Sequence, residues 1–378
     1  MTSVDEALRS MIERQGPMGF DVLVDAALYD PSGGFYLDGG RAGRRGDFIT
    51  SPEVGPLFGA VVARALDEWW AEAGEPSVFV VVEAGAGPGT LARTVLHARP
   101  ACSAALRYVL VERSASQRAS HADRLELEAP AAAFASLASP DDGHPRTPPP
   151  PGPIVVSLAQ LPRIPGPCIV LANELLDNLP FRLAERGVDG WNEVLVGLED
   201  ASLVEVLVPL APADAARLDL VAGAAPPGAR VPMPRAAAAW LHDAVELAGP
   251  TGRVVAIDYA TSTADLAARP WREWVRTYRR HDRGGTPFAA LGTQDITCEV
   301  ATDQLGVVPT SDQSQAEWLR AHGLDELVEE GRRIWRERAS SGDLEAVRAR
   351  SRIGEADALT DPVSLGAFRV LEWHRRDG

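Results

Sequence analysis

Three glycines at alternating positions follow an apolar run that ends in an acid, an arrangement well suited to binding a cofactor. The run Val80–Val82 leads into Glu83, and the glycines are Gly85, Gly87 and Gly89. This order of residues predicts a strand, a tight turn and a helix whose first N–H groups face a ligand. The third glycine comes one position earlier than in the G-x-G-x-x-G loop of dinucleotide-binding proteins. The spacing therefore disfavours a nicotinamide cofactor, and with it an NAD-dependent oxidoreductase.

Two acids at strand ends indicate which cofactor the loop binds. Glu83 precedes the first glycine by two residues, where a carboxylate repels phosphate and attracts an ammonium or sulfonium group. Glu112 ends the next apolar run, and an acid about 20 to 30 residues beyond such a loop can accept hydrogen bonds from ribose hydroxyls. S-adenosyl-L-methionine carries both cations and a ribose. We therefore predict this cofactor, with a strand-to-helix turn that binds no ligand as the alternative.

A third cluster of polar residues supplies candidates for the chemistry of methyl transfer. This reaction is an in-line displacement, so the protein must position a nucleophile and take up its proton. Asn173, Glu174 and Asp177 follow a fourth apolar run, and the two acids share a face if a helix begins there. We predict Glu174 and Asp177 as catalytic residues and Asn173 as a cofactor contact. Equally open is that Asn173 caps a helix whose dipole the acids complement.

The glycine-flanked segment 43–53 is polar, as expected of a loop folded over a substrate. It contributes Gly46, Asp47 and Thr50 as candidate substrate contacts and Glu53 as a third candidate catalytic acid. Ser51 and Pro52 also fit the start of a helix, with Ser51 as the N-cap. An exposed turn before a capped helix is therefore the simpler explanation of this segment by itself.

Two other strand ends complete the candidate site. Asp258 and Tyr259 end the apolar run 253–257, and ligands of open α/β sheets collect at the carboxyl ends of strands. We predict that both residues lie on the substrate side, although they also fit polar groups that are satisfied within the fold. Ser157–Gln160 follow the third apolar run and are predicted to line the adenine, with Ser157 as a cofactor contact.

The elements that must position these residues alternate between strand and helix. Residues 78–112 predict a βαβ unit, which implies a parallel sheet, and 154–158 and 168–172 predict two more buried strands. We expect four parts: an N-terminal helical cap with a substrate-side loop (1–75), the first part of the cofactor-binding core (76–180, with a proline-rich loop at 129–153), an inserted β-rich lid (181–235), and the remainder of the core (236–378).

Composition excludes several classes of partner. The net charge of −16 disfavours nucleic acid and anionic membranes, and no stretch approaches the length of a membrane span. Cys102, Cys168 and Cys298 lack a C-x-x-C pattern, and the histidines lack metal-binding spacing, so we expect no metal site. A reducing compartment fits these cysteines, and we expect a soluble, cytoplasmic protein.

Together, these motifs resemble those of the S-adenosylmethionine-dependent methyltransferase family that includes the mitochondrial complex I assembly-factor protein arginine methyltransferase and its bacterial relatives. The segments that carry the resemblance are 46–53, 83–91 and 172–180, with weaker matches at 257–259 and 295–297. The sequence departs from the family pattern at Pro88, where an arginine is usual, and at Leu175 and Leu176, where an aromatic pair is usual.

The resemblance implies an α/β, class I (Rossmann-like) methyltransferase fold, with a mostly parallel sheet and helices on both faces. It also implies a methyltransferase that uses S-adenosyl-L-methionine to N-methylate a protein acceptor, with arginine as a candidate residue. The alternatives are a methyltransferase that acts on a small molecule, and a non-catalytic assembly or scaffold protein that retains the fold.

Overall fold

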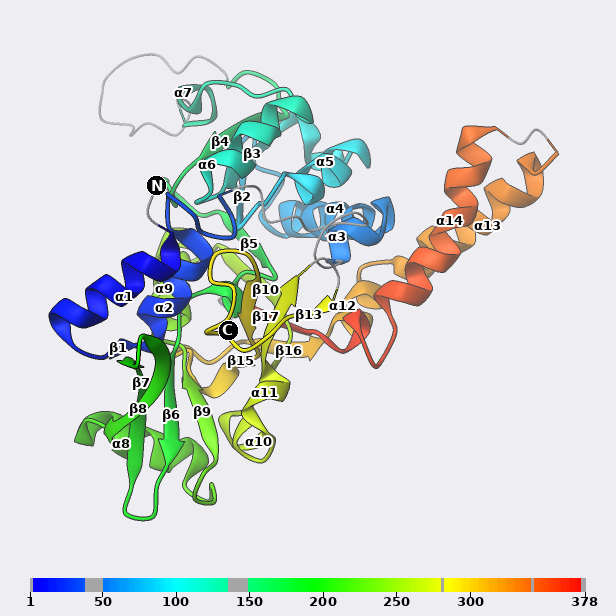
Figure 1. Cartoon of the computed structure of the whole chain (residues 1–378). Coiled ribbons are helices and arrows are strands. Elements are labelled where there is room, and N and C mark those ends of the chain that lie inside the picture. The colour runs from blue at the N-terminus through cyan, green and yellow to red at the C-terminus, as the bar shows by residue number, and fades with distance from the viewer. Residues whose placement is uncertain (1–2, 38–49, 135–148, 280–281, 341–342, 375–378) are drawn as a thin grey trace.

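A computed structural model of the chain describes residues 3–37, 50–134, 149–279, 282–340 and 343–374. Figure 1 shows a large sheet flanked by helices, a second sheet beside the N-terminal helices, and a helical hairpin that projects from the body. Gly46 and Asp47, two of the predicted substrate contacts, lie outside the described residues.

The large sheet has seven strands in the order β16-β17-β10-β5-β2-β3-β4. Five neighbouring strands from β10 to β4 are parallel, and β17 and β16 add an antiparallel edge. Strands β2 and β3 are buried along their whole length, as their unbroken apolar runs require in a sheet covered on both faces. The predicted mostly parallel sheet is confirmed. Its strands are β2 (Phe79–Ala84), β3 (Leu106–Val111), β4 (Ile154–Leu158), β5 (Ile169–Asn173), β10 (Arg253–Asp258), β16 (Ser311–Ser314) and β17 (Arg369–His374).

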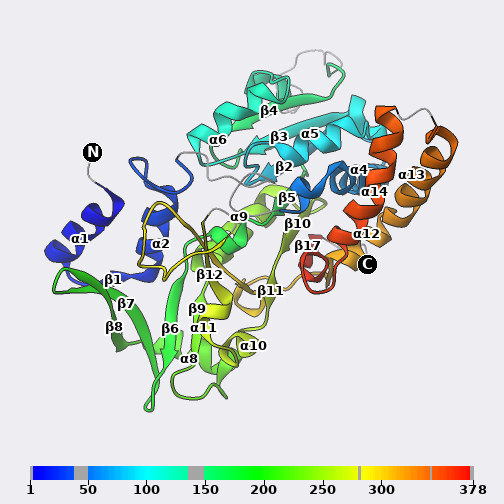
Figure 2. The same cartoon turned by 45° about the vertical axis from the view of Figure 1, so that its right-hand side comes forward.

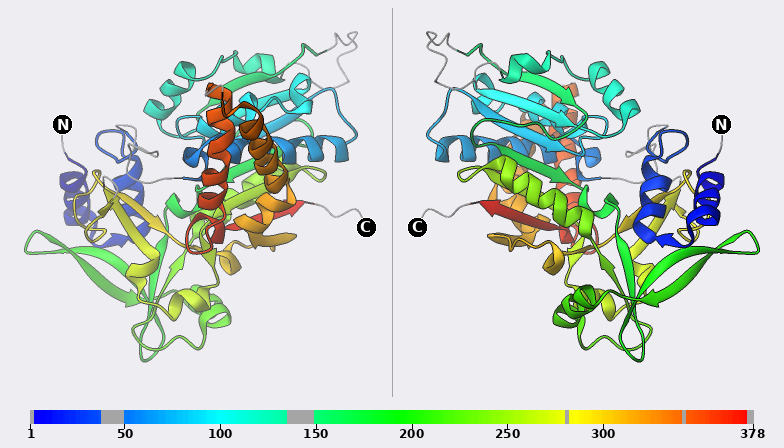
Figure 3. Two further views of the ribbon diagram at one scale, coloured as in Figure 1. Left: turned by 90° about the vertical axis from the view of Figure 1, so that its right-hand side faces the viewer. Right: turned by 90° about the vertical axis from the view of Figure 1, so that its left-hand side faces the viewer.

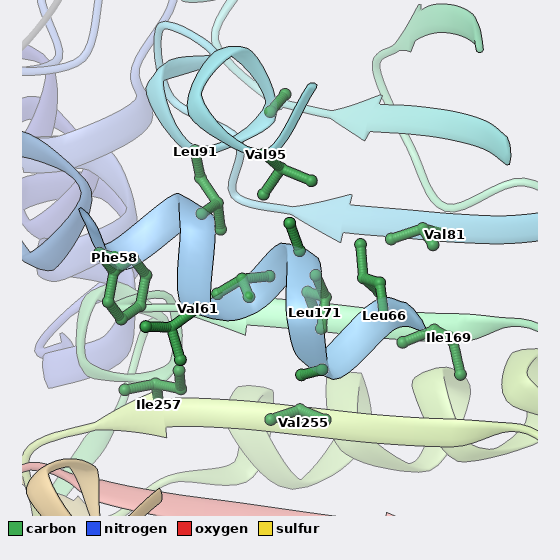
Figure 4. Close-up of a cluster of buried hydrophobic side chains, with 14 of the residues drawn as sticks. Phe58, Val61, Leu66, Val81, Leu91, Val95, Ile169, Leu171, Val255 and Ile257 are labelled. Carbon is green, nitrogen blue, oxygen red and sulfur yellow. The ribbon is translucent and has the colours of Figure 1, made fainter. Parts of the chain in front are cut away.

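Helices cover both faces of this sheet. One face packs against α4 (Pro56–Glu72) and α5 (Thr90–His97), and the other against α9 (Arg235–Ala248) and α7 (Pro130–Phe134). Figure 4 shows Phe58, Val61 and Leu66 of α4 directed toward apolar side chains of the sheet. The remaining segments around the core are α3 (Ser51–Val54), α6 (Ala115–Ala119), α12 (Gln315–Ala321), α13 (Leu324–Arg338), α14 (Leu344–Leu359), η1 (Ala101–Ala104), η2 (Ser120–Asp123), η5 (Leu176–Asn178), η6 (Thr302–Gln304) and η7 (Leu365–Ala367).

A second sheet lies to one side of the first (Figures 2 and 3). Its strands pair in the order β1-β7-β6-β9, with β8 added to β7. Helices α1 (Val4–Gln15) and α2 (Phe20–Tyr29) pack on it through a shared apolar cluster that includes Phe20, Phe181 and Val194. The N-terminal helices and the segment 181–235 therefore form one unit. Its other elements are β1 (Met18–Gly19), β6 (Arg182–Arg186), β7 (Trp191–Glu199), β8 (Ser202–Pro209), α8 (Pro212–Ala222) and β9 (Arg230–Met233).

Residues 260–279 and 282–301 contribute the strands of two smaller sheets. Strand β12 pairs with both β13 and β14, and β11 pairs with β15. Trp274 is fully buried here, so the aromatic and arginine-rich segment around it belongs partly to the core. The elements are β11 (Ala260–Thr261), α10 (Thr263–Ala267), α11 (Trp271–Trp274), β12 (Val275–Arg279), β13 (Asp282–Arg283), β14 (Asp295–Cys298) and β15 (Val300–Ala301).

Three local features depend on particular turn residues. The proline-punctuated stretch up to Pro234 contains helix α8, because Pro212 occupies its first turn, where a missing N–H costs nothing. Residues 318–327 span the end of α12 and the start of α13, which are separated at Gly323 with its left-handed backbone (φ 85°). No α-helix begins at Asn173, and Glu174 adopts a left-handed φ of 51° before the short turn η5.

The described residues contain neither a membrane-spanning helix nor a metal-binding cluster. Within the ranges given above, none of the helices combines the length and apolar character needed to span a bilayer. In the same part of the chain, no three His, Cys, Asp or Glu side chains form a group that could hold a metal ion. All three cysteines are buried and unpaired.

Candidate active site

The glycine turn between β2 and α5 has the geometry of a cradle for a ligand. Gly85, Gly87 and Gly89 all have left-handed φ angles, of 68°, 52° and 78°. A Cβ at Gly85 would lie 2.9 Å from Leu175 Cδ1, whereas one at Gly87 would point into open space. Glycines are therefore needed for the backbone path, and the loop exposes its main chain at Gly87.

A cavity of about 650 Å³ opens beside this turn. It lies at the carboxyl ends of β2, β3 and β5, next to the point between β2 and β5 where the strand order reverses. Such a switch point is where open α/β sheets bind their ligands. Ten of the residues predicted from the sequence line this cavity: Thr50, Glu53, Glu83, Gly85, Gly87, Glu112, Ala159, Gln160, Asn173 and Glu174.

Glu112 ties the end of β3 to the glycine turn. Its Oε2 accepts a hydrogen bond from the Gly87 N–H (2.9 Å), and its Oε1 accepts one from the Ser114 N–H (2.7 Å). Burial raises the pKa of Glu112, and these backbone donors partly oppose that effect. Each carboxylate oxygen has a further lone pair, so Glu112 can still accept hydrogen bonds from two hydroxyl groups of a ligand.

Glu83 is the buried acid at the end of β2. The Tyr108 hydroxyl donates to its Oε2 over 2.7 Å, and only 4% of the residue is exposed. Burial raises the pKa of Glu83 to about 7, although the hydrogen bond from Tyr108 stabilises the carboxylate. A cation bound beside Glu83 would favour its ionised form.

Glu174 and Asn173 form the third side of the cavity. Glu174 Oε1 accepts hydrogen bonds from Asn173 Nδ2 (3.1 Å) and from the Ser51 N–H (3.2 Å). Burial, together with the nearby charge of Asp177, raises the pKa of Glu174 to about 8. Asn173 Oδ1 is buried and has no hydrogen-bond partner among the described residues. This oxygen is therefore available to a donor on a ligand.

Glu53 reaches the cavity from α3, opposite the sheet. Its Oε1 accepts a hydrogen bond from the Thr90 hydroxyl over 2.7 Å, and Thr90 is the first residue of α5. This contact joins the segment predicted to face the substrate to the helix that follows the glycine turn. The cavity therefore contains both the acids predicted to contact the cofactor, Glu83 and Glu112, and two of the acids predicted to act on the acceptor, Glu53 and Glu174.

Comparison with known proteins identifies the family of this chain. Residues 61–319 match a family described as "Putative S-adenosyl-L-methionine-dependent methyltransferase". The chain belongs to this methyltransferase family. A solved protein from Burkholderia thailandensis with S-adenosyl-homocysteine bound has a TM-score of 0.79 and 27% identity, over 99% of this chain and 92% of that one.

Curated relatives of this methyltransferase are named as arginine methyltransferases. The Drosophila melanogaster protein arginine methyltransferase NDUFAF7 homolog is 43% identical over 94 residues, which cover 25% of this chain and 22% of that protein. The Danio rerio protein arginine methyltransferase NDUFAF7 is 31% identical over 205 residues, which cover 52% and 47%. The methyltransferase thus spans less than half the length of these relatives.

These relatives correct one expectation. They are named as mitochondrial proteins, so the predicted cytoplasmic location is wrong. The prediction rested on unpaired cysteines, which persist in any reducing compartment and do not distinguish one such compartment from another.

The lining of the cavity fits the family's cofactor. S-adenosyl-L-methionine presents an ammonium and a sulfonium as cations, a carboxylate, and two ribose hydroxyls. The orphaned Asn173 Oδ1 can accept from an ammonium, the buried Glu83 carboxylate attracts positive charge, and Glu112 stands where hydroxyls need acceptors. The open space at Gly87 lets a ligand approach the backbone.

Three predicted residues of the methyltransferase lie behind the cavity wall. The Tyr259 hydroxyl donates to Asp177 Oδ2 (2.5 Å), and Asp258 Oδ2 accepts from the N–H groups of Leu176 (2.9 Å) and Asp177 (3.2 Å). Burial raises the pKa of Asp177 to about 6 and raises that of Asp258 well above its ordinary value. Because η5 is held by Asp258, Glu174 and Asp177 do not share a helix face.

Two predicted cofactor residues also stand away from the cavity. Gly89 is the N-cap of α5. The Ser157 hydroxyl lies 2.8 Å from Nδ1 of the fully buried His121, whose Nε2 lies 2.7 Å from the Gly87 carbonyl oxygen. Since that oxygen only accepts, Nε2 carries the proton and Nδ1 accepts from Ser157. Ser157 thus supports the glycine turn through His121.

Sequence reasoning missed several residues that line the cavity. Tyr29 is the last residue of α2, and Tyr36 follows this helix. The two rings stack on each other, and their hydroxyls donate to Asn178 O (3.2 Å) and Asn178 Oδ1 (3.1 Å). Asn178 falls within the segment 172–180 that carries the resemblance, whereas neither tyrosine lies in a motif. Other lining residues that were not predicted include Arg113, Leu161, Trp240 and Asp243, whereas Ala159 and Gln160 belong to the stretch predicted to line the adenine.

Proposed function

We propose that this chain transfers the methyl group of S-adenosyl-L-methionine to a nitrogen of a protein acceptor, with an arginine side chain as the favoured substrate. The observation that carries the proposal is the placement of Glu53 and Glu174 in the same cavity as the glycine turn. The names of the curated relatives support an arginine acceptor. The cofactor, when bound, supplies an electrophilic methyl group.

The acids of the cavity match the chemical problem of a guanidinium acceptor. A guanidinium has a pKa above about 12 and is a poor nucleophile while protonated. Glu174 is the stronger candidate base, because burial raises its pKa to about 8 and a base is most effective near the working pH. A cationic acceptor beside Glu174 stabilises the carboxylate, so acceptor binding itself favours the ionised base.

Glu53 and Asp177 have different parts in this proposal. Glu53 lines the cavity and orients the acceptor nitrogen through Oε2, which has no partner among the described residues, since Thr90 donates to Oε1. Asp177 is 3% exposed and bound to Tyr259, so it acts on the acceptor only through Glu174, whose charge it influences.

We also propose that the N-terminal helices form a cap over the acceptor side. Tyr29 and Tyr36 bring this unit to the cavity wall, and both bond to Asn178. None of the described lining residues comes from 181–235. The role proposed for that segment is therefore to hold α1 and α2 in place, through the cluster around Phe20 and Phe181, more than to cover the cavity as a lid.

The test is transfer of labelled methyl from S-adenosyl-L-methionine to proteins of a lysate, followed by mass spectrometry of the modified residue. We expect methylarginine in the protein fraction. Label found only in metabolites would replace the protein acceptor by a small molecule, and a chain that does not bind S-adenosyl-L-methionine would favour the scaffold alternative.

Variants then test the assigned roles. Glu174→Gln should lower kcat by about 10²-fold or more, which is the usual contribution of a general base, while cofactor binding is retained. Glu199→Gln, at an exposed position at the end of β7, is the matched control. Wild-type turnover by Glu174→Gln would refute the assignment of the base.

A further inference from the structure

The projecting hairpin of α13 and α14 contributes no described residue to the cavity. It lies outside residues 61–319, which match the family (Figures 1 and 3). Its helices pack closely, because a Cβ at Gly331 would lie 2.6 Å from the Ala349 carbonyl oxygen, and Arg352 donates to the Leu327 carbonyl over 2.8 Å. The position of this hairpin can therefore affect the segments that contact its base.

At that base, a buried acid of α14 contacts the start of α4. Glu355 is 6% exposed; its Oε2 accepts from the Leu57 N–H (2.9 Å), and its Oε1 accepts from the Ser351 hydroxyl (2.7 Å). A Cβ at Gly55 would lie 2.2 Å from Glu355 Cδ, so the carboxyl group fits against the backbone only because residue 55 is glycine.

A second buried side chain holds the preceding residues. Gln315, the first residue of α12, accepts from the Ser51 hydroxyl (2.8 Å) and donates from Nε2 to the Leu359 carbonyl at the end of α14 (3.1 Å). Both Ser51 and Gln315 are fully buried. The segment from Ser51 to Leu57 is thus held at both ends. Glu355 is a residue of α14, and Gln315 is bonded to the last residue of α14.

Between these two contacts lies α3, which carries Glu53 into the cavity and whose first N–H is bonded to Glu174. A single helical turn of four residues is not stable by itself. Its position must therefore come from its neighbours, which include the buried side chains of Gln315, bonded to Ser51, and Glu355, bonded to Leu57 just beyond α3.

We propose that Glu355 and Gln315 are positioning residues, through which the hairpin sets the place of Glu53 and the hydrogen bond to Glu174 for the acceptor reaction. This inference rests on the proposed function. The cofactor cradle is built from β2, β3 and α5, so loss of either residue should impair the acceptor step and leave cofactor affinity intact.

The kinetic test compares two charge-matched pairs on α14. Glu355→Ala should lower kcat/KM for the protein acceptor about tenfold or more, because a displacement of about 1 Å can cost up to about 10²-fold in rate. Glu355→Gln should recover most of this loss, since its amide oxygen can still accept from Leu57. Asp357→Ala and Asp357→Asn, exposed on the same helix, are the controls. The dissociation constant of S-adenosyl-L-methionine should be the same in all five proteins.

A double-mutant cycle separates positioning from a general loss of folding. Gly55→Ala forces a methyl group against the Glu355 carboxyl group and should lower kcat/KM. Adding Glu355→Ala makes room for that methyl group, so the double variant should lose less activity than the product of the two single effects. Full multiplicativity, or wild-type kcat/KM in Glu355→Ala, would overturn the inference.

Hydrogen exchange tests the contact without any acceptor. The amide protons within residues 51–57 should exchange faster in Glu355→Ala than in wild type, and they should remain protected in Asp357→Ala. Unchanged protection in Glu355→Ala would refute the positioning role of Glu355. If wild-type protein methylates no acceptor, the proposed function fails, and the exchange result alone decides whether Glu355 holds this segment in place.

Discussion

The buried Glu83 should make cofactor binding depend on pH near neutrality. Its pKa is raised to about 7 in the free protein, and only the carboxylate form attracts the cations of the cofactor. If the protonated form does not bind, the apparent dissociation constant is multiplied by 1 + 10^(pKa − pH). Affinity should then rise with pH and tighten about eightfold between pH 6 and pH 7.5.

Calorimetry of S-adenosyl-L-methionine binding measures this effect directly. Binding at pH 7 should release about half a proton to the buffer, because about half of the Glu83 side chains are protonated before binding. The titrations should be run in the Glu174→Gln background, since Glu174 also lines the cavity with a raised pKa. They should stop at pH 7.5, because the α-amino group of the ligand begins to lose its proton near pH 8.

Two variants decide whether Glu83 is the group responsible. Glu83→Gln should bind weakly and with no pH dependence over this range. Tyr108→Phe removes the hydrogen bond that stabilises the carboxylate, so the pKa of Glu83 should rise by about one unit and affinity at pH 7.5 should fall about threefold. An affinity that does not change between pH 6 and 7.5, or a pH dependence that survives in Glu83→Gln, would refute the reasoning.

Three further predictions concern the support of the site. His121→Ala should weaken cofactor binding about fivefold, as measured by calorimetry, because the Gly87 carbonyl loses a hydrogen bond worth about 1 kcal/mol; unchanged affinity would contradict this role. Asp258→Ala should lower the free energy of unfolding in urea by about 3 kcal/mol, since buried N–H groups at Leu176 and Asp177 lose their acceptor, and a loss below 1 kcal/mol would count against it. Gly59→Ala places a Cβ 2.1 Å from Thr94 Oγ1, between α4 and α5, and should lower the free energy of unfolding by about 1–3 kcal/mol in the same assay. Wild-type stability of this variant would show that the two helices can move apart without cost.

The sequence was most informative where one residue pattern has one structural solution. The apolar runs leading to Glu83 and Glu112 are buried on both faces, so their periodicity and length predicted neighbouring parallel strands. The alternating glycines likewise predicted the turn, because the left-handed backbone there strongly favours glycine.

Tertiary contacts decided what local patterns could not. Glu174 and Asp177 have helical spacing, but Asp258, which is 81 residues from Asp177 in the chain, holds the intervening N–H groups in a different turn. Tyr29 and Tyr36 belong to no motif, and they reach the cavity only because α2 packs on a sheet formed mostly by residues 182–233. This packing cannot be predicted from any local pattern in the sequence.

The left-handed backbone of Glu174 has a consequence for laboratory evolution. A residue other than glycine costs about 1 kcal/mol or more in this conformation, and desolvation of the partly buried carboxyl group adds a further cost. Selection for heat resistance alone should therefore enrich glycine at position 174 and yield variants that are more thermostable but inactive. Selection that also demands turnover should keep the acid, so the two regimes would diverge at this one codon.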